Sequence, residues 1–140
     1  MITLVKDTID NDDIDRLVDW LKTYPRLTKG EVTLEFEKKY SKWLGRKYSV
    51  FCNSGSSANL LMLSALQQGG YLTNNKVVVP SVAWATDLAP VMQLGLEPIL
   101  CDSNKRDLSA DLEHLEQIFE EELPSVLLFV SVLGIVPEMH

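Results

Sequence analysis

The chain has 140 residues, of which 46% are hydrophobic and 24% are charged, with a formal net charge of -7 at pH 7. This composition is typical of a globular protein of about one domain and excludes a chain that is disordered throughout. The acidic balance argues against nucleic acid as a main partner, because binding its phosphates requires clustered Lys and Arg. The longest apolar run, residues 126–136, is too short to span a bilayer. The acidic N-terminus also lacks the apolar core of a signal peptide, so a cytoplasmic protein is expected.

Two helices are predicted in residues 1–47. In the first, apolar residues recur at helical spacing after acidic residues suited to capping, and Pro25 marks its end. The apolar residues of this helix are Ile14, Leu17, Val18 and Leu21. The second helix begins near Glu31 and ends at Gly45, where a left-handed C-cap belongs. Its apolar face consists of Phe36, Tyr40, Trp43 and Leu44.

From residue 48 onward, short β-rich runs alternate with helical patterns. Strands are predicted at residues 48–53, 76–80, 97–102 and 125–132. Helices are predicted at residues 56–66, 83–95 and 109–122. The second of these helices must accommodate Pro90. The third is amphipathic, with one face formed by Leu112, Leu115 and Phe119.

These runs predict an α/β fold, a three-layer α/β/α arrangement with a mostly parallel sheet. The strands lack polar alternation, which is typical of strands covered by helices on both faces. Successive strand–helix–strand units form right-handed crossovers. Residues 1–140 are therefore interpreted as a single partial domain, in which residues 1–47 supply N-terminal helices and residues 48–140 supply the βαβ units. The chain ends just after a strand that no further helix covers, which indicates a partial chain.

The two cysteines, Cys52 and Cys101, lie in apolar stretches with the character of strands. This pattern predicts buried, reduced thiols. The sequence has no CxxC motif and no His and Cys residues at ligand spacing, so no metal site is expected.

The segment 53–59, with the sequence NSGSSAN, joins a predicted strand to a predicted helix. Free amides at a helix N-terminus, together with the helix dipole, form an anion site. Gly55 lets the backbone approach a ligand closely, and Ser56 and Ser57 add hydroxyl donors, which suits one phosphate monoester. A Ser N-cap on a purely structural helix explains the same residues equally well. The segment matches neither the Walker loop nor the GxGxxG dinucleotide motif.

A second segment, residues 80–86 with the sequence PSVAWAT, also follows a predicted strand and opens a predicted helix. Ligands in open α/β sheets bind beyond the carboxyl ends of the strands, so both segments are expected to face one crevice. Trp84 can stack on a flat aromatic ligand there. Considered alone, Trp84 fits an ordinary core residue better.

In order and spacing, these segments resemble the DegT/DnrJ/EryC1/StrS family of sugar aminotransferases, which are fold type I enzymes that use pyridoxal 5'-phosphate (PLP). Residues 27–63 are similar to the family's opening, with a Gly-containing loop, a Phe-Glu helix, a Leu-Gly helix end and a Ser-Gly-Ser turn. Residues 77–102 look like its next unit, with a ring-stacking aromatic residue, a Gly that ends the helix and a following Asp. The expected fold is thus the N-terminal part of the large domain of such an enzyme.

The resemblance implies roles for a few residues. Gly55, Ser56 and Ser57 are expected to hold the PLP phosphate through amides and hydroxyls, and Trp84 is expected to stack on the pyridine ring. Asp102 matches the family in position without an assigned chemistry. The loop 28–30 is expected, weakly, to approach the substrate. The family also implies a homodimer in which the partner subunit completes each active site.

Two chemistries are implied on this scaffold. The main expectation is amination of a keto sugar nucleotide with glutamate as the usual amino donor, in surface polysaccharide or deoxyamino-sugar biosynthesis. Typical members have a His-Leu-Tyr-Gly-like sequence where this chain has Ser-Val-Leu-Gly at residues 131–134. That departure, with the SGSSANLLM stretch and Trp84, looks more like the subgroup of 4-keto-6-deoxy sugar nucleotide 3-dehydratases. These replace the catalytic Lys with His and eliminate the C3 hydroxyl.

No catalytic residue is expected within these 140 residues. In the family, the catalytic Lys or His and the Asp beneath the pyridine ring follow the strand near residue 130. None of the lysines present fits that role, since Lys76 precedes a strand, Lys105 lies in an acidic loop and the others precede residue 53. The chain alone is therefore expected not to catalyse transamination.

Two functions of other classes remain open. A flavodoxin-like or Rossmann-like module would use the turn at residues 54–57 for a nucleotide phosphate, although the absence of a glycine fingerprint and the presence of Trp84 count against it. A truncated, non-catalytic remnant is compatible with the same family resemblance.

Overall fold

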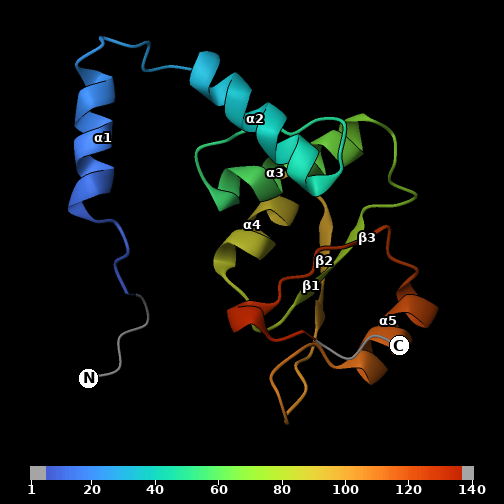
Figure 1. Cartoon of the computed structure of the whole chain (residues 1–140). Helices are drawn as coiled ribbons and strands as arrows, with labels where there is room; N and C mark the ends of the chain where they lie inside the picture. The colour runs from blue at the N-terminus through green and yellow to red at the C-terminus, as the bar shows by residue number, and fades with distance from the viewer. Residues whose placement is uncertain (1–5, 137–140) are drawn as a thin grey trace. The chain divides into compact units, whose positions relative to one another are not determined.

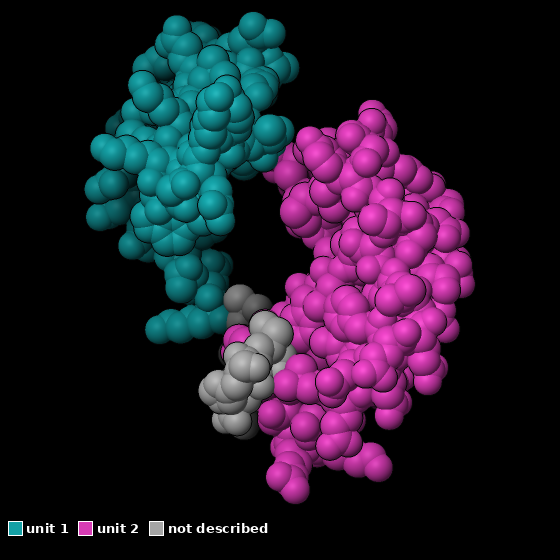
Figure 2. All heavy atoms as spheres, turned by 90° about the vertical axis from the view of Figure 1, so that its right-hand side faces the viewer, with its two compact units in different colours: residues 1–51 teal, residues 52–140 magenta. Residues whose placement is uncertain are grey.

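The computed structural model describes residues 6–136 and contains two compact units, Met1–Phe51 and Cys52–His140 (Figure 2). The organisation of residues 1–140 as a single partial domain stays a prediction. Within residues 6–136, no helix combines the length and the apolar character needed to cross a membrane.

The first unit contains the helices α1 (Asn11–Leu21) and α2 (Glu31–Leu44). α1 begins with a capping box, in which the Asp10 carboxylate accepts from the amide of Asp13 and the Asp13 carboxylate accepts from the amide of Asp10. α2 ends at Gly45, whose φ of 65° is left-handed. Both predicted helices and the predicted C-cap are confirmed.

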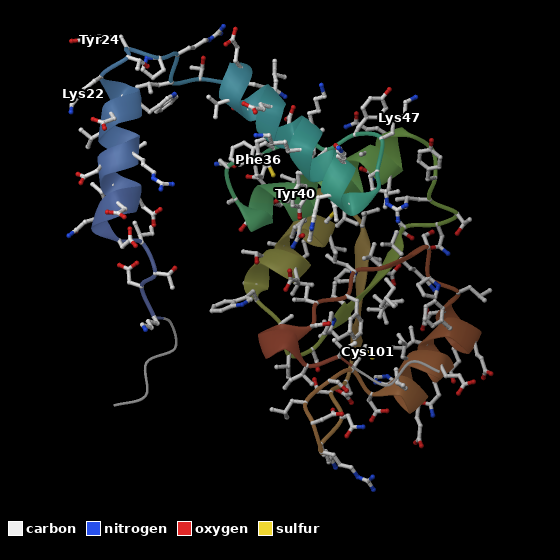
Figure 3. All side chains as sticks on the ribbon, in the orientation of Figure 1. Lys22, Tyr24, Phe36, Tyr40, Lys47 and Cys101 are labelled. Atoms are coloured by element: carbon white, nitrogen blue, oxygen red, sulfur yellow. The ribbon has the colours of Figure 1, made fainter. Side chains whose placement is uncertain are left out.

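Side chains of α2 hold the segment that follows it. The Glu37 carboxylate accepts hydrogen bonds from the Phe51 amide and from the Lys29 ammonium group, both at 2.9 Å. The Phe36 ring stacks on Tyr40 and meets the Phe51 ring edge-on, each pair with centroids 5.7 Å apart (Figure 3 labels Phe36 and Tyr40).

The strand predicted at residues 48–53 is wrong, because these residues have irregular backbone. The Phe51 amide bonds to a side chain of α2 and not to a neighbouring strand. β propensity reflects the fit of side chains to a sheet surface, so an apolar run forms a strand only where a partner strand is available.

The second unit has the element order α3 (Gly55–Gln68), β1 (Lys76–Pro80), α4 (Ala85–Gln93), β2 (Glu97–Cys101), α5 (Leu112–Glu122), β3 (Val126–Leu127) and a short 3-10 turn, η1 (Val132–Gly134). In the described part of the chain, the three strands form one parallel sheet in the order β2-β1-β3. Val78 of β1 lies opposite Ile99 and Leu127 in the register.

The central strand β1 separates two apolar cores. Val77 and Val79 belong to the core on the side of α3 and α4, which also contains Leu63, Val91 and Leu96. Val78 belongs to the core on the side of α5, which also contains Cys101, Ala110, Leu115 and Ile118. Each of the three valines is at most 1% exposed, and burying such a side chain stabilises the fold by about 1.5–3 kcal/mol. Helices on both faces of a parallel sheet confirm the predicted three-layer α/β/α class (Figure 1).

The C-terminal part of the unit differs from its prediction in three respects. The strand expected at residues 125–132 is restricted to Val126–Leu127. Two further hydrogen bonds to β1 flank it, from the Ser125 amide to the Lys76 carbonyl at 3.0 Å and from the Leu128 amide to the Val78 carbonyl at 2.9 Å. The helix expected from residue 109 begins at Leu112, since the Asp111 carboxylate caps it. Phe119 is 42% exposed, so Ile118, and not Phe119, joins Leu115 in the core.

The cysteine prediction is correct for one residue. Cys101, at the end of β2, is a free and buried thiol beside α5 (Figure 3), and burial, followed by the nearby carboxylates of Asp111 and Asp102, raises the pKa of this thiol. Cys52 is also free but is only half-buried, because the strand that was to bury it does not form.

Candidate functional site

The N-termini of α3 and α4 lie at the same edge of the sheet. The two helices are side by side (Figure 1), with Asn59 bonded to Asp87 near their N-termini and Gln67 bonded to the Leu94 carbonyl near their C-termini. α4 forms the crossover between the parallel strands β1 and β2, so its N-terminus lies at the carboxyl end of β1. Both N-termini therefore lie where open α/β sheets bind ligands.

The predicted phosphate-binding residues Gly55, Ser56 and Ser57 form the first turn of α3. The N-cap residue, Ser54, accepts a hydrogen bond from the Ser57 amide and donates one to the Ser57 hydroxyl, both at 3.2 Å. The Ser N-cap considered in the sequence analysis is thus present. It uses the Ser57 amide and leaves the hydroxyl proton of Ser57 available for a further acceptor.

Two amides of this turn point to no protein acceptor. Among the residues that the structure describes, the amides of Gly55 and Ser56 have no hydrogen-bond partner, as first-turn amides of a helix commonly do not. Both residues are exposed. A Cβ atom added at Gly55 would meet nothing within 4 Å, so the space beside the backbone is open. Two free amides, nearby hydroxyls and the helix dipole provide what an anion needs.

Trp84 is the N-cap residue of α4 and is 70% exposed. The interpretation of Trp84 as an ordinary core residue is therefore wrong for the described chain. An exposed indole at the end of a strand presents a flat apolar face to whatever lies beyond the sheet edge.

Asn59 and Asp87 connect these two turns, and neither was predicted from the sequence to belong to the site. The Asn59 side-chain amide, two residues after Ser57, donates to the Asp87 carboxylate at 2.9 Å and to the Thr86 carbonyl at 3.3 Å. Asp87 is only 4% exposed, and its second carboxylate oxygen is buried without a hydrogen-bond partner among the described residues. In the sequence, only Pro90 pointed to this contact. A proline inside a helix leaves the carbonyl four residues earlier, here that of Thr86, without its usual donor, but it does not indicate which group replaces that donor.

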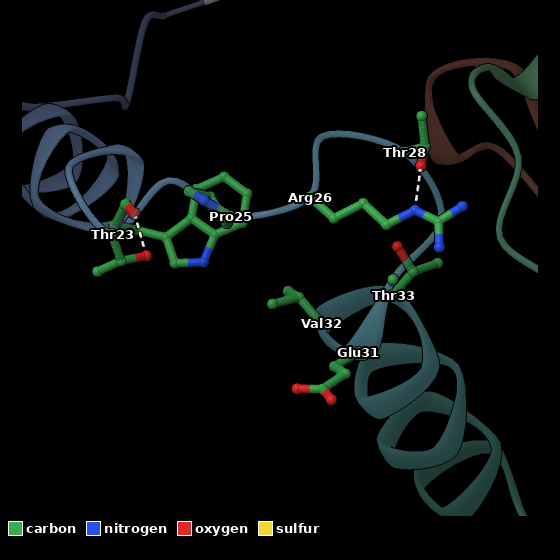
Figure 4. Close-up of a pocket in the computed structure, with 9 residues that line it drawn as sticks. Thr23, Pro25, Arg26, Thr28, Glu31, Val32 and Thr33 are labelled. Atoms are coloured by element: carbon green, nitrogen blue, oxygen red, sulfur yellow. Dashed lines mark hydrogen bonds between the residues drawn. The ribbon is translucent and has the colours of Figure 1, made fainter.

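The remaining expected residues lie elsewhere. Asp102 directly follows β2, and its amide donates to Nδ1 of His114 at 3.1 Å. The loop 28–30 belongs to the first unit, where Arg26 donates from Nε to the Thr28 hydroxyl at 2.6 Å beside a pocket (Figure 4). Its approach to a substrate stays a prediction. Residues 131–134, where the sequence departs from His-Leu-Tyr-Gly, include the 3-10 turn η1.

The fold is a three-layer α/β/α arrangement in which two helix N-termini meet at one edge of a parallel sheet, and it matches PLP-dependent enzymes of fold type I over their N-terminal part. The model of the DegT/DnrJ/EryC1/StrS aminotransferase family matches residues 7–140. The chain belongs to this family.

Relatives in the family include both chemistries named in the sequence analysis. The GDP-4-keto-6-deoxy-D-mannose 3-dehydratase of Yersinia pseudotuberculosis is 37% identical over 110 residues, which are 76% of this chain and 28% of the relative. The GDP-perosamine synthase of Caulobacter vibrioides is 25% identical over 126 residues, which are 90% of this chain and 33% of the relative. The chain thus spans about a third or less of the length of these relatives.

Solved structures give the same picture. The structure of the E. coli GDP-4-keto-6-deoxy-D-mannose-3-dehydratase with bound hydrated PLP superposes with a TM-score of 0.71 at 32% identity, covering 81% of this chain and 30% of that one. A GDP-4-keto-6-deoxymannose-3-dehydratase with a trapped PLP-glutamate geminal diamine also gives a TM-score of 0.71, at 31% identity, covering 82% of this chain and 30% of that one. These matches confirm the fold over the N-terminal part of such enzymes.

Proposed function

We propose that this chain is the part of a PLP-dependent sugar-nucleotide enzyme that binds the cofactor's phosphate and one face of its ring. The observation that carries the proposal is the pair of hydrogen bonds from Asn59, which join an anion-binding helix N-terminus to a helix that begins at the exposed Trp84. The presence of PLP in a structurally similar dehydratase supports it.

The residues present fit the cofactor. The amides of Gly55 and Ser56 donate to phosphate oxygens, and the hydroxyls of Ser56 and Ser57 add two further donors. The dipole of α3 favours the doubly charged phosphate at this end of the helix. Trp84 covers one face of the ring and excludes water from it. When bound, PLP supplies a protonated pyridine ring that acts as an electron sink.

Within the family, we favour dehydration of a GDP-linked 4-keto-6-deoxy sugar over amination, which was the main expectation from the sequence. The greater identity to the Yersinia dehydratase than to the perosamine synthase supports this choice. The Ser-Val-Leu-Gly sequence at residues 131–134 supports it as well. Glutamate as a second small-molecule ligand, found with PLP in a similar dehydratase, and a homodimeric assembly belong to the same proposal.

Calorimetric titration of the 140-residue chain tests the binding role. The ligand is 4-deoxypyridoxine 5-phosphate, which keeps the ring and phosphate of PLP and lacks the aldehyde that reacts with surface lysines. We expect Ser56→Ala and Trp84→Ala each to weaken binding about tenfold, roughly 1.4 kcal/mol. Trp43→Ala is the matched control, because Trp43 is also largely exposed, at 77%, but lies on α2. Saturable binding of GMP with no binding of 4-deoxypyridoxine 5-phosphate would instead favour a nucleotide-binding module.

A pair of chimeras tests the choice of chemistry. The chain replaces the matching segment of the Yersinia dehydratase and, separately, that of the Caulobacter perosamine synthase. Each host supplies its own catalytic residues, so the measurement is which host keeps its activity, followed by mass spectrometry of the product. We expect the dehydratase chimera to keep more of its host's activity than the synthase chimera. The reverse result, with both chimeras folded, contradicts the dehydratase assignment and restores the aminotransferase assignment.

A further inference from the structure

The helix α4 contains a proline that frees one backbone carbonyl. Pro90 lies inside α4 and has no amide proton, so it cannot donate to the carbonyl of Thr86, four residues earlier. A helical carbonyl that loses its donor must find another partner or remain unsatisfied. Here the Asn59 side chain of α3 supplies that donor, with an N–O distance of 3.3 Å.

The same amide group also contacts Asp87. A side-chain amide has two protons, and Asn59 directs one of them to the Thr86 carbonyl and the other to the Asp87 carboxylate at 2.9 Å. Asp87 is only 4% exposed, so solvent competes little with this hydrogen bond.

The position of this pair matters more than its strength. Asn59 lies two residues beyond Ser57, and Asp87 lies three residues beyond Trp84. Each partner is thus within one helical turn of a residue assigned to the cofactor. A second α3–α4 hydrogen bond, from Gln67 to the Leu94 carbonyl at 3.2 Å, lies at the far ends of the same helices.

We infer that Asn59 and Asp87 are a positioning pair that sets the spacing between the phosphate-binding turn at residues 54–57 and the ring-stacking residue Trp84. The inference rests on the proposed function. The role assigned to the pair is to hold two binding elements on separate helices at one separation, through the bonds of Asn59 to α4. A ligand that uses both elements gains from this rigidity, because the second contact follows the first without further ordering of the protein.

The test compares a two-point ligand with a one-point ligand. Calorimetry gives the affinity of the 140-residue chain for 4-deoxypyridoxine 5-phosphate, which engages both elements. Displacement of that ligand by inorganic phosphate gives the affinity for phosphate alone. For Asn59→Leu we expect the first affinity to fall about tenfold and the second to change less than twofold, since about 1.4 kcal/mol of pairing energy corresponds to tenfold.

Three further variants separate positioning from general damage. Asp87→Asn keeps an oxygen for the Asn59 amide and is expected to retain the affinity of the unchanged chain within about twofold. Gln67→Met removes the other α3–α4 bond and is expected to lower the unfolding midpoint without changing either affinity. Where Asn59→Leu does not fold, Asn59→Ser carries the test, because one hydroxyl proton cannot serve both acceptors.

The outcomes are distinct. If the Asn59 variants lose affinity for both ligands to the same extent, the positioning role is overturned and the pair contributes to stability alone. The same conclusion follows if Gln67→Met lowers the affinity for 4-deoxypyridoxine 5-phosphate as much as Asn59→Leu does. Unchanged affinities in the Asn59 variants overturn it as well. Failure of the unchanged chain to bind the two-point ligand overturns the proposed function, and this inference with it.

Discussion

The Ser54 hydroxyl accepts a hydrogen bond from the Ser57 amide and donates one to the Ser57 hydroxyl, both at 3.2 Å. One side chain therefore holds both the amide and the hydroxyl of Ser57, the third residue of the helix. Because Ser54 takes one of the free amides, those of Gly55 and Ser56 are left for an external anion. The cap thus stabilises α3 and also sets the donors that the proposed phosphate site uses.

We predict that Ser54→Ala lowers the free energy of unfolding by about 1 kcal/mol, the usual cost of losing an N-cap. Urea unfolding followed by circular dichroism measures it. Ser56→Ala, in the same turn, removes an exposed hydroxyl without a protein partner and is expected to change stability by less than about 0.5 kcal/mol. An equal loss in both variants would show that Ser54 has no special role.

We predict that Gly55→Ala leaves stability unchanged but weakens binding of inorganic phosphate. The added Cβ meets no protein atom within 4 Å, so any effect arises from the ligand's approach. Gly45→Ala is the contrasting variant, because Gly45 has a φ of 65° and a left-handed alanine costs about 1 kcal/mol. Phosphate affinity that is unaffected by Gly55→Ala would mean that the anion does not approach this backbone.

Leu63→Ala is predicted to lower the free energy of unfolding by about 2–5 kcal/mol, since it removes a buried side chain and leaves a cavity. Leu63 is 1% exposed and belongs to the same apolar core as Val77, Val79 and Val91. Leu61→Ala, on the exposed side of the same helix at 47% exposure, is expected to cost less than about 1 kcal/mol. Chemical denaturation of both variants checks the orientation of α3, and similar losses would show that the assigned buried face is wrong.

The Glu37 carboxylate predicts a pH dependence in the first unit. Its hydrogen bond from the Phe51 amide, and then that from Lys29, lower the pKa of Glu37 from its ordinary value of 4.5. A carboxylate with a lowered folded-state pKa stabilises the fold above its ordinary pKa and loses that contribution as the pH falls through the lower folded value. The stability difference between the unchanged chain and Glu37→Gln is therefore expected to be full at pH 6 and to shrink at and below about pH 4.

Glu35 provides the control for this prediction. The pKa of Glu35 is also lowered, by its hydrogen bond and ion pair with Lys39, but both side chains are more than 60% exposed. Salt screens such a pair, so the effect of Glu35→Gln is expected to vanish at about 1 M NaCl while that of Glu37→Gln persists. Loss of both effects in salt would mean that the backbone bond to Phe51 contributes little.

Local signals predicted much of the fold. The strand at residues 76–80 has the predicted bounds, and α2 ends at the predicted Gly45. Both depend on local features, a run of valines closed by Pro80 and a glycine at a C-cap. The βαβ alternation then limited the topology to a parallel sheet with helices on both faces, as observed.

Features that depend on distant partners were not predictable from the sequence. Residues 48–53 have the composition of a strand, but Phe51 bonds to Glu37 of α2, and no local pattern encodes that choice. The Asn59–Asp87 contact joins residues 28 positions apart, and a short polar pair on two helices has no sequence signature. The apolar run continues to Val130, but strand pairing with β1 ends at Leu127, and no local pattern in the sequence marks that end.

The most direct test of the account is a two-dimensional ¹H–¹⁵N NMR titration of the chain. The account predicts that the amide signals of Gly55 and Ser56 shift most with both inorganic phosphate and 4-deoxypyridoxine 5-phosphate. It predicts that the indole signal of Trp84 shifts only with the second ligand, which has a ring. Shifts centred on other residues, or none at Gly55 and Ser56 at saturating ligand, would contradict the assignment of the cofactor site to the N-termini of α3 and α4.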